Sequence, residues 1–287
     1  MIVIPDTELI LNKQKKIYHL NLSKEQIADD IILVGDPSRV ESISKYFDQI
    51  EYKVQNREFY THTGIYKNKR ISVISTGIGT DNIDIVLNEL DALVNINLEN
   101  RTVNKKHKSL NIIRIGTSGG LQKDIPVDSF IAGSYGLGFD GLAHFYNHSD
   151  LETEQKNAFI KHCNWPKELA EPYIVKASDT LLEKFHDIDS GITATATGFY
   201  GPQGRNLRLT CSIDKFEEKL SSFYYKELKI KNFEMETSAL YFLSKILGHN
   251  AISICAIMGN RITKKYSNNY TNTLNKLILT VLERLSN

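Results

Sequence analysis

Two kinds of apolar pattern alternate along the chain. Short runs rich in Ile and Val, several without a regular polar side, are typical of strands that are buried on both faces. Longer segments repeat their apolar residues every three or four positions, as the buried face of an amphipathic helix does. The short runs predict strands at residues 31–34, 70–76, 111–116, 129–135, 191–197 and 251–258. The longer segments predict helices at residues 37–47, from 81 onward, at 236–247 and at 274–285.

Two of the predicted helices carry signals for where they begin. Pro37 stands at a first helical position, where its missing N–H is not needed. Asp81 has a side chain that can cap the helix whose apolar face begins at Ile83. Because strands and helices alternate, we expect an α/β fold with a mainly parallel sheet.

No linker rich in Pro, Gly or Ser divides the chain. The one long polar segment, residues 95–111, is expected to be a surface insertion. We therefore expect residues 1–287 to form a single domain.

Composition narrows the functional classes. The 287 residues include 35 Lys plus Arg and 34 Asp plus Glu, and this net charge of +1 disfavours a dedicated nucleic-acid binder. Three cysteines, Cys163, Cys211 and Cys255, are too few for a disulfide framework and favour a reducing compartment. The longest apolar run, residues 251–258, is far shorter than the roughly 20 residues that span a bilayer, and the N-terminus has no signal-peptide core. We therefore expect a cytoplasmic protein that does not bind membranes.

Two familiar patterns occur in contexts that do not support them. Gly136, Gly138 and Gly141 match the GxGxxG spacing of dinucleotide sites, but no clear amphipathic helix follows them. His144 and His148 have the spacing of a zinc-binding pair, but the glutamate of an HExxH motif is missing. We therefore predict neither a nucleotide cofactor nor a bound metal.

Residues suited to an anion follow or interrupt the predicted strands. In VGDPSRV, Gly35 lets a ligand approach the backbone and Arg39 lies in the first turn of the next helix, a pattern that suits phosphate. A βα turn with a surface arginine would look the same. Arg114 interrupts the apolar strand IIRIG, before Thr117, and its burial requires either an anionic ligand or a buried carboxylate. Arg57 in NREF is a third candidate cation.

A pair of glutamates suggests a sugar site. In FEMETS, Glu234 and Glu236 flank Met235 where a helix is expected to begin. A carboxylate held there can accept two sugar hydroxyls. Acidic residues at a helix start also compensate the helix dipole without binding anything, and this alternative stays open.

The segment GFYGPQGR suggests a site for a planar ring. Gln203 has both a donor and an acceptor, Arg205 has a guanidinium group, and Phe199 has an aromatic ring. Together they can recognise the edge and face of a heterocycle. A Gly/Pro turn with exposed polar tips is the alternative.

Taken together, GDPSRV, STGIG, RIGTSG, GFYGPQGR and EMET resemble the motifs of the nucleoside phosphorylase-I family, and most of all its uridine phosphorylase group. The matches run in order from about His19 to Arg261, over nearly the whole chain. The resemblance implies a single α/β domain with a mixed central sheet that is partly barrel-like and flanked by helices.

The resemblance also implies roles for individual residues. Phosphate would be bound by Gly35, Arg39, Arg57, Arg114 and Thr117. Ribose would be bound by His19, Met235 and Glu236, and the base by Phe199, Gln203, Arg205 and Arg261. Arg57 and His19 would come from a neighbouring subunit, so a homodimer is the implied minimal unit and a hexamer stays open.

The implied reaction is phosphorolysis of uridine to uracil and ribose 1-phosphate, as in pyrimidine nucleoside salvage. Inorganic phosphate would be the co-substrate, with no metal or organic cofactor, and a structural monovalent cation between subunits stays open. Asn260 aligns with an aspartate of purine-specific relatives, which disfavours purine chemistry. The alternatives are a purine or broad-specificity nucleoside phosphorylase, a hydrolytic nucleosidase of the same fold, and a catalytically silent nucleoside-binding protein.

Overall fold

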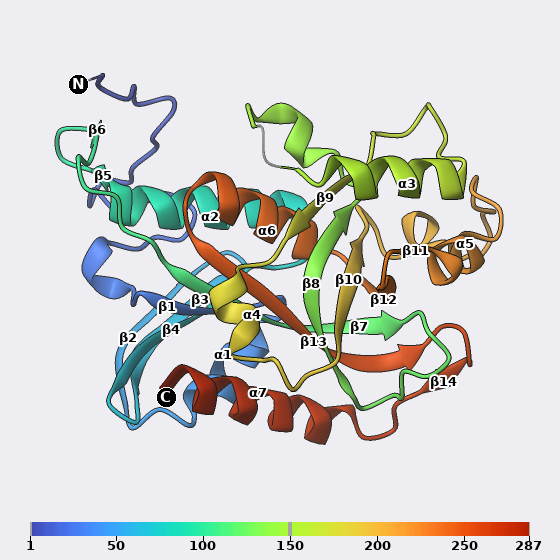
Figure 1. The fold of residues 1–287 in the computed structure, drawn as a ribbon. Helices are drawn as coiled ribbons and strands as arrows, with labels where there is room; N and C mark the ends of the chain where they lie inside the picture. Colours follow the sequence, from blue (N-terminus) through green and yellow to red (C-terminus); the bar gives the residue numbers. More distant parts are fainter. Residues whose placement is uncertain (1, 149–150, 287) are drawn as a thin grey trace.

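The computed structural model describes residues 2–148 and 151–286, and it shows a large mixed sheet with helices on both faces (Figure 1). The strands are β1 (Asp30–Val34), β2 (Gln49–Asn56), β3 (Phe59–Tyr66), β4 (Lys69–Ser75), β5 (Ile96–Asn97), β6 (Thr102–Val103), β7 (Asn111–Gly120), β8 (Phe130–Gly138), β9 (Tyr173–Lys176), β10 (Ser190–Thr195), β11 (Tyr224–Tyr225), β12 (Leu228–Glu234), β13 (Asn250–Asn260) and β14 (Lys265–Tyr266). The α-helices are α1 (Pro37–Ser44), α2 (Thr80–Asn95), α3 (Thr153–Cys163), α4 (Asp179–Glu183), α5 (Phe216–Ser222), α6 (Thr237–Ile246) and α7 (Tyr270–Ser286). Short 3-10 helices cover Lys24–Gln26, Leu142–Phe145 and Gly201–Gln203.

The main sheet has the strand order β11-β12-β10-β8-β13-β7-β1-β4-β3-β2. Because β12 also pairs with β7, the strands β12, β10, β8, β13 and β7 close into a ring. Strand β1 is parallel to β4 and β7, and β7 is parallel to β13, whereas β13 is antiparallel to β8. The predicted α/β fold with a mixed, partly barrel-like sheet is therefore confirmed.

Two helical layers bury the open part of the sheet. Helices α2 and α6 lie on one face, and α1, α4 and α7 lie on the other (Figure 1). Every residue of β1 is buried, which explains why its sequence is apolar without alternation.

Tyr241 fixes α6 to the sheet. Its hydroxyl donates to the carbonyl of Gly133 in β8 at 2.6 Å and accepts the N–H of Ser253 in β13 at 2.8 Å. The side chain is almost fully buried, so both bonds are shielded from water. The middle of α6 is thus fixed against β8 and β13.

The predicted strands and helices are all present, but one detail is wrong. Asp81 does not cap α2, because the helix begins at Thr80 and its N-cap is Gly79, which has a φ of 104°. Only glycine adopts such a φ without strain. Because glycine has no side chain, Gly79 makes no side-chain cap for α2. The β2–β3 hairpin was not predicted, because β2 is an edge strand that alternates between exposed and half-buried residues.

The polar segment 95–111 contains the short β5–β6 hairpin, and eight of its 17 residues are exposed, six are half-buried and three are buried. Arg101 within it donates from Nε to the carbonyl of Ile4 at 2.8 Å, which ties the N-terminal segment to the insertion. Across the described residues, no helix combines the length and apolarity that a membrane crossing requires.

Candidate active site

A cavity of about 940 Å³ lies where β1, β7, β12 and β13 end. Ligands bind at such carboxyl ends in α/β sheets, and this volume suits a small organic molecule. Most of the predicted site residues line the cavity: Gly35, Arg39, Arg114, Thr117, Phe199, Gln203, Arg205, Met235, Glu236 and Arg261. His19 and Arg57 do not line it.

One part of the cavity, here called the anion end, contains Arg39 and Arg114. Arg39 extends from the first turn of α1, and its Nη1 donates to the carbonyl of Ile115 at 3.2 Å. Burial and the neighbouring charge of Arg114 lower the pKa of Arg39. Among the described residues no carboxylate pairs with Arg39, so positive charge is left for an anionic ligand.

Arg114 and Glu236 form a buried ion pair beside Arg39. Arg114 Nη2 donates to Glu236 Oε2, and the two side chains are 6% and 5% exposed. The other oxygen of Glu236 accepts the N–H of Gly79 at 2.8 Å. The sequence left open whether Arg114 meets a ligand or a buried carboxylate. The structure shows a buried carboxylate, and this carboxylate lines the same cavity.

Glu234 holds the start of α6. Its carboxylate accepts the N–H groups of Glu236 and Thr237, both at 3.0 Å, and the hydroxyl of Thr195 at 2.8 Å. The helix-end interpretation therefore describes Glu234, whereas Glu236 is directed to Arg114. Burial and the nearby charge of Glu236 raise the pKa of Glu234 to about 7.

A second part of the cavity, here called the base end, contains Phe199, Gln203 and Arg205. Arg205 Nη1 donates to the carbonyl of Phe199 at 2.6 Å and to Gln203 Oε1, and its guanidinium carbon lies 3.9 Å from the centre of the Phe199 ring. Gln203 is 2% exposed, so its side chain is not an exposed tip of the turn, whereas Phe199 is 51% exposed.

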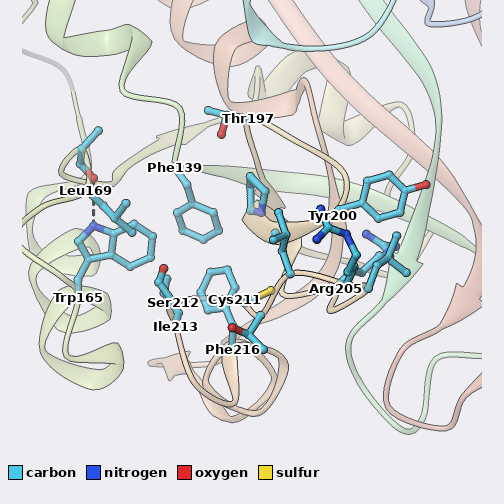
Figure 2. A pocket seen from close by; sticks show the side chains of 17 residues that line it. Phe139, Trp165, Leu169, Thr197, Tyr200, Arg205, Cys211, Ser212, Ile213 and Phe216 are labelled. Carbon is cyan, nitrogen blue, oxygen red and sulfur yellow. Dashed lines mark hydrogen bonds between the residues drawn. The ribbon is translucent and has the colours of Figure 1, made fainter.

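A second cavity of about 700 Å³ has Arg205 in its wall (Figure 2). Arg205 also lines the first cavity, at its base end. In its wall, Phe139 stacks on Trp165 with ring centroids 4.9 Å apart, and Phe216 lies 5.6 Å from Phe139. Residues 207–213 form another part of the wall. Arg205 therefore separates a polar base end from an aromatic space.

His19 and Arg57 lie near each other but outside the cavity lining. His19 Nδ1 is 2.7 Å from Glu89 Oε1. Arg57 is exposed in the β2–β3 turn with a φ of 54°, and its guanidinium carbon lies 5.8 Å from the centre of the Tyr18 ring. Asn56 connects them, because its Nδ2 donates to the carbonyl of His19 at 2.7 Å.

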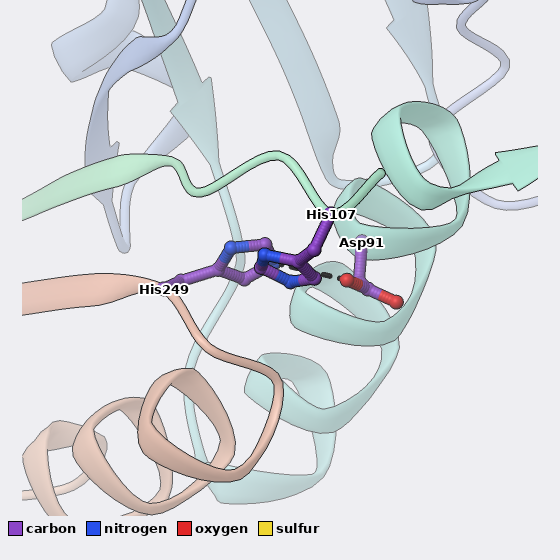
Figure 3. A group of neighbouring side chains, drawn as sticks. All are labelled: Asp91, His107 and His249. Atoms are coloured by element: carbon purple, nitrogen blue, oxygen red, sulfur yellow. Dashed lines mark ion pairs between the residues drawn. The ribbon is translucent and has the colours of Figure 1, made fainter. Parts of the chain in front are cut away.

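Asp91, His107 and His249 form a separate cluster whose candidate ligand atoms lie within 4.8 Å of one another (Figure 3). His107 Nε2 donates to the carbonyl of Leu247 at 2.8 Å. His249 Nδ1 accepts the N–H of Leu110 at 3.2 Å, so the ring proton is on Nε2, 3.2 Å from Asp91. A metal at Nε2 would displace this proton and break the bond to Leu110, so the cluster fits a His–Asp contact better than a metal site.

Glu217 is a site residue that the sequence did not single out. It pairs with Arg261 at the base end, although it lies in the charged stretch FEEK, which matches no motif. Only the folded chain brings α5 and the end of β13 together.

The family model of the Phosphorylase superfamily matches residues 29–283. The chain belongs to this superfamily. The match covers the anion end, the Arg114–Glu236 pair and the base end, so the resemblance inferred from the motifs is confirmed.

Named relatives include both pyrimidine and purine enzymes. A uridine phosphorylase of Thermococcus kodakarensis is 30% identical over 255 residues, which are 87% of this chain and 79% of the relative. A DeoD-type purine nucleoside phosphorylase of Bacillus subtilis is 27% identical over 246 residues, which are 85% and 88% of the two chains.

Among solved structures, a Trypanosoma brucei nucleoside phosphorylase described as showing uridine phosphorylase activity matches with a TM-score of 0.88. It is 28% identical, and the match covers 96% of this chain and 99% of the other. A purine nucleoside phosphorylase of Toxoplasma gondii has a TM-score of 0.68 at 20% identity over 96% and 98% of the chains, and it shares the fold. Membership in the superfamily therefore supports the general reaction class of a nucleoside phosphorylase, and the relatives include enzymes named for pyrimidine and for purine nucleosides.

We expect Glu234 to make the folded protein less stable as the pH rises from 4.5 to about 7, its unfolded and folded pKa values. The folded chain retains on Glu234 a proton that the unfolded chain has released, so raising the pH favours unfolding. Glu234→Gln should flatten this part of the curve of unfolding free energy against pH, measured by urea denaturation in phosphate-free buffer. Glu218→Gln, on the exposed side of α5, is the control and should keep the wild-type slope. An unchanged slope in Glu234→Gln would contradict the assignment.

Proposed function

We propose that this protein catalyses the reversible phosphorolysis of uridine to uracil and ribose 1-phosphate. The grouping of residues in one cavity supports the proposal most directly. Arg39 and Arg114 suit phosphate, Glu236 beside them suits ribose hydroxyls, and Gln203 with Arg205 suits the edge of a base. Membership in the phosphorylase superfamily supports the same reaction class.

Phosphate would bind at the anion end, with Thr117 and the backbone of Gly35 beside the two arginines. Guanidinium groups make charge-assisted, often bidentate bonds to phosphate, and Arg39 has its charge available. Holding phosphate next to the anomeric carbon converts a bimolecular step into an effectively unimolecular one, which lowers the entropic part of the barrier. Glu236 would hold the ribose hydroxyls, with Met235 beside it, and its negative charge would favour the cationic sugar of the transition state.

The base end would stabilise the departing uracil. Negative charge builds on the pyrimidine as the glycosidic bond breaks. Gln203 can donate from its amide nitrogen because its oxygen already accepts from Arg205. Burial and the charge of Arg261 lower the pKa of Arg205 to about 10, so its guanidinium is still charged at neutral pH. Donors held in advance in this way stabilise a developing anion more than mobile water does.

Asn260 supports a pyrimidine rather than a purine base. Its Nδ2 donates to the carbonyls of Gln122 and Ile125, and its Oδ1 accepts the N–H groups of Ile262 and Thr263. This amide uses all of its hydrogen-bonding capacity on the backbone, and it has no acidic proton for a purine nitrogen. It acts as a fixed part of the turn after β13.

A purine nucleoside phosphorylase is the second candidate. The cavity beyond Arg205 offers space for a larger base, and purine enzymes are among the relatives. A hydrolytic nucleosidase is less well supported, because water as the nucleophile needs no pair of arginines at the anion end.

The deciding experiment compares uridine with inosine, each with and without phosphate. We expect uracil to form from uridine only when phosphate is present, with ribose 1-phosphate as the second product. Chromatographic separation of base from nucleoside measures both. Equal release of uracil without phosphate would indicate a hydrolase, and faster cleavage of inosine than of uridine would favour the purine enzyme.

We also propose that Arg57 and His19 complete the cavity of a neighbouring subunit in a homodimer. Arg57 is exposed beside Tyr18, itself 40% exposed, and among the described residues no carboxylate pairs with it. In a two-fold dimer, Arg57 of each chain would extend into the cavity of the other chain.

Mixed dimers test this proposal. Arg57→Ala and Glu236→Ala should each be nearly inactive alone, but in a mixed dimer one cavity collects both changes and the other collects neither. After equal amounts are unfolded and refolded together, roughly a quarter of all sites should be intact, because half of the dimers are mixed. Phosphorolysis by the mixture is compared with that of each variant refolded alone. If subunits exchange and the mixture stays at the average of its parents, Arg57 acts within its own chain.

A further inference from the structure

Arg261 is held at the base end by a carboxylate. It is 9% exposed, and its Nε at 2.9 Å and its Nη2 both donate to Oε1 of Glu217. The second oxygen of Glu217 accepts from Lys264 Nζ at 2.8 Å, and the Lys264 side chain is 72% exposed. Glu217 therefore lies between a buried cation of the cavity wall and a cation in solvent.

The remaining nitrogen of Arg261, Nη1, is buried and has no hydrogen-bond partner among the residues that the structure describes, although Arg261 lines the cavity. A guanidinium group is planar, so a carboxylate that binds Nε and Nη2 also fixes the direction of Nη1. Glu217 thus determines which way the unused donors of Arg261 point.

Glu217 is itself held firmly, because it is the second residue of α5. Phe216, which precedes it, is buried against Phe139 and Phe233 with ring centroids 5.6 and 6.0 Å away. A Cβ on Gly204 would lie 3.3 Å from Phe216 Cβ, so α5 also packs on the turn between Gln203 and Arg205. Glu217 and the turn from Gln203 to Arg205 therefore pack together, through Phe216 and Gly204.

The charges explain why a carboxylate is needed there. Arg205 and Arg261 repel each other, and Glu217 opposes this repulsion. Burial would raise the pKa of Glu217, but bonds from Lys264 and Arg261 hold it below its usual value, so the carboxylate is charged at neutral pH. Without it, two cations would face each other with no counter-charge in a partly buried site.

We infer that Glu217 is a positioning residue for the departing base, which holds Arg261 in place and allows Arg205 and Arg261 to act side by side on the same anion. This inference rests on the proposed function. It adds a residue that does not touch the substrate and acts through Arg261.

The test compares Glu217→Gln with Glu218→Gln, its exposed neighbour on α5. Glutamine keeps the size of the side chain and an acceptor oxygen but removes the charge. We expect Glu217→Gln to lower kcat on uridine by about tenfold to a hundredfold and to leave the KM for phosphate unchanged. The loss should be smaller on 5-fluorouridine, because its more acidic base needs less stabilisation when it leaves. Glu217→Asp, which keeps the charge, should recover part of the activity.

Kinetics of Glu217→Gln that match those of Glu218→Gln would overturn the inference. An equal loss on uridine and 5-fluorouridine would overturn it too, because a smaller amount of folded enzyme has that effect. If the unmodified protein cleaves inosine and not uridine, the proposed specificity for uridine is wrong, but the role of Glu217 can still be tested. The kcat values of Glu217→Gln and Glu218→Gln are then compared on inosine, because Arg261 lines the cavity whichever base is bound.

Discussion

The buried ion pair between Arg114 and Glu236 is the constraint on which the rest of the site depends. Two charges removed from water are costly unless each finds its partner and further hydrogen bonds. Glu236 obtains its second bond from the N–H of Gly79, so β7, the start of α6 and the turn before α2 must meet at one point. Both side chains also line the cavity, so the pair that holds these three elements together forms part of the wall of the candidate site.

The topology of the sheet brings the other groups to this pair. β1 and β13 flank β7 in parallel, so the segments after all three open on the same side. β12 then pairs with β7 through Phe233 opposite Gly119 and delivers Glu236 to Arg114. The closed ring thus places Glu236, the proposed ribose-binding residue, beside the anion end. The base end is added by the turn after β10, which α5 supports.

The sequence could predict the residues that stand directly at strand or helix ends. Arg39 and Glu236 are of this kind, and Arg114 was noticeable because a charge interrupts an apolar strand. The sequence could not predict which carboxylate faces Arg114, because that depends on the pairing of β12 with β7. It also could not predict Glu217, which lies 44 positions from Arg261 and meets it only through the packing of α5. Asp81 has the residue type of a helix cap, but α2 begins at Thr80 and Gly79, which has no side chain, is its N-cap.

The central claim is that phosphate binds at Arg114 next to a carboxylate that serves the sugar. Calorimetric titration of inorganic phosphate into the wild-type protein, Arg114→Met and Glu236→Gln tests it most directly. We expect at least tenfold weaker phosphate binding in Arg114→Met, because its charge is lost. In Glu236→Gln we expect phosphate binding at least as tight as in the wild type, because Arg114 is released from its partner, together with nearly abolished turnover. Phosphate binding that Arg114→Met leaves unchanged, or that Glu236→Gln abolishes, would contradict the account.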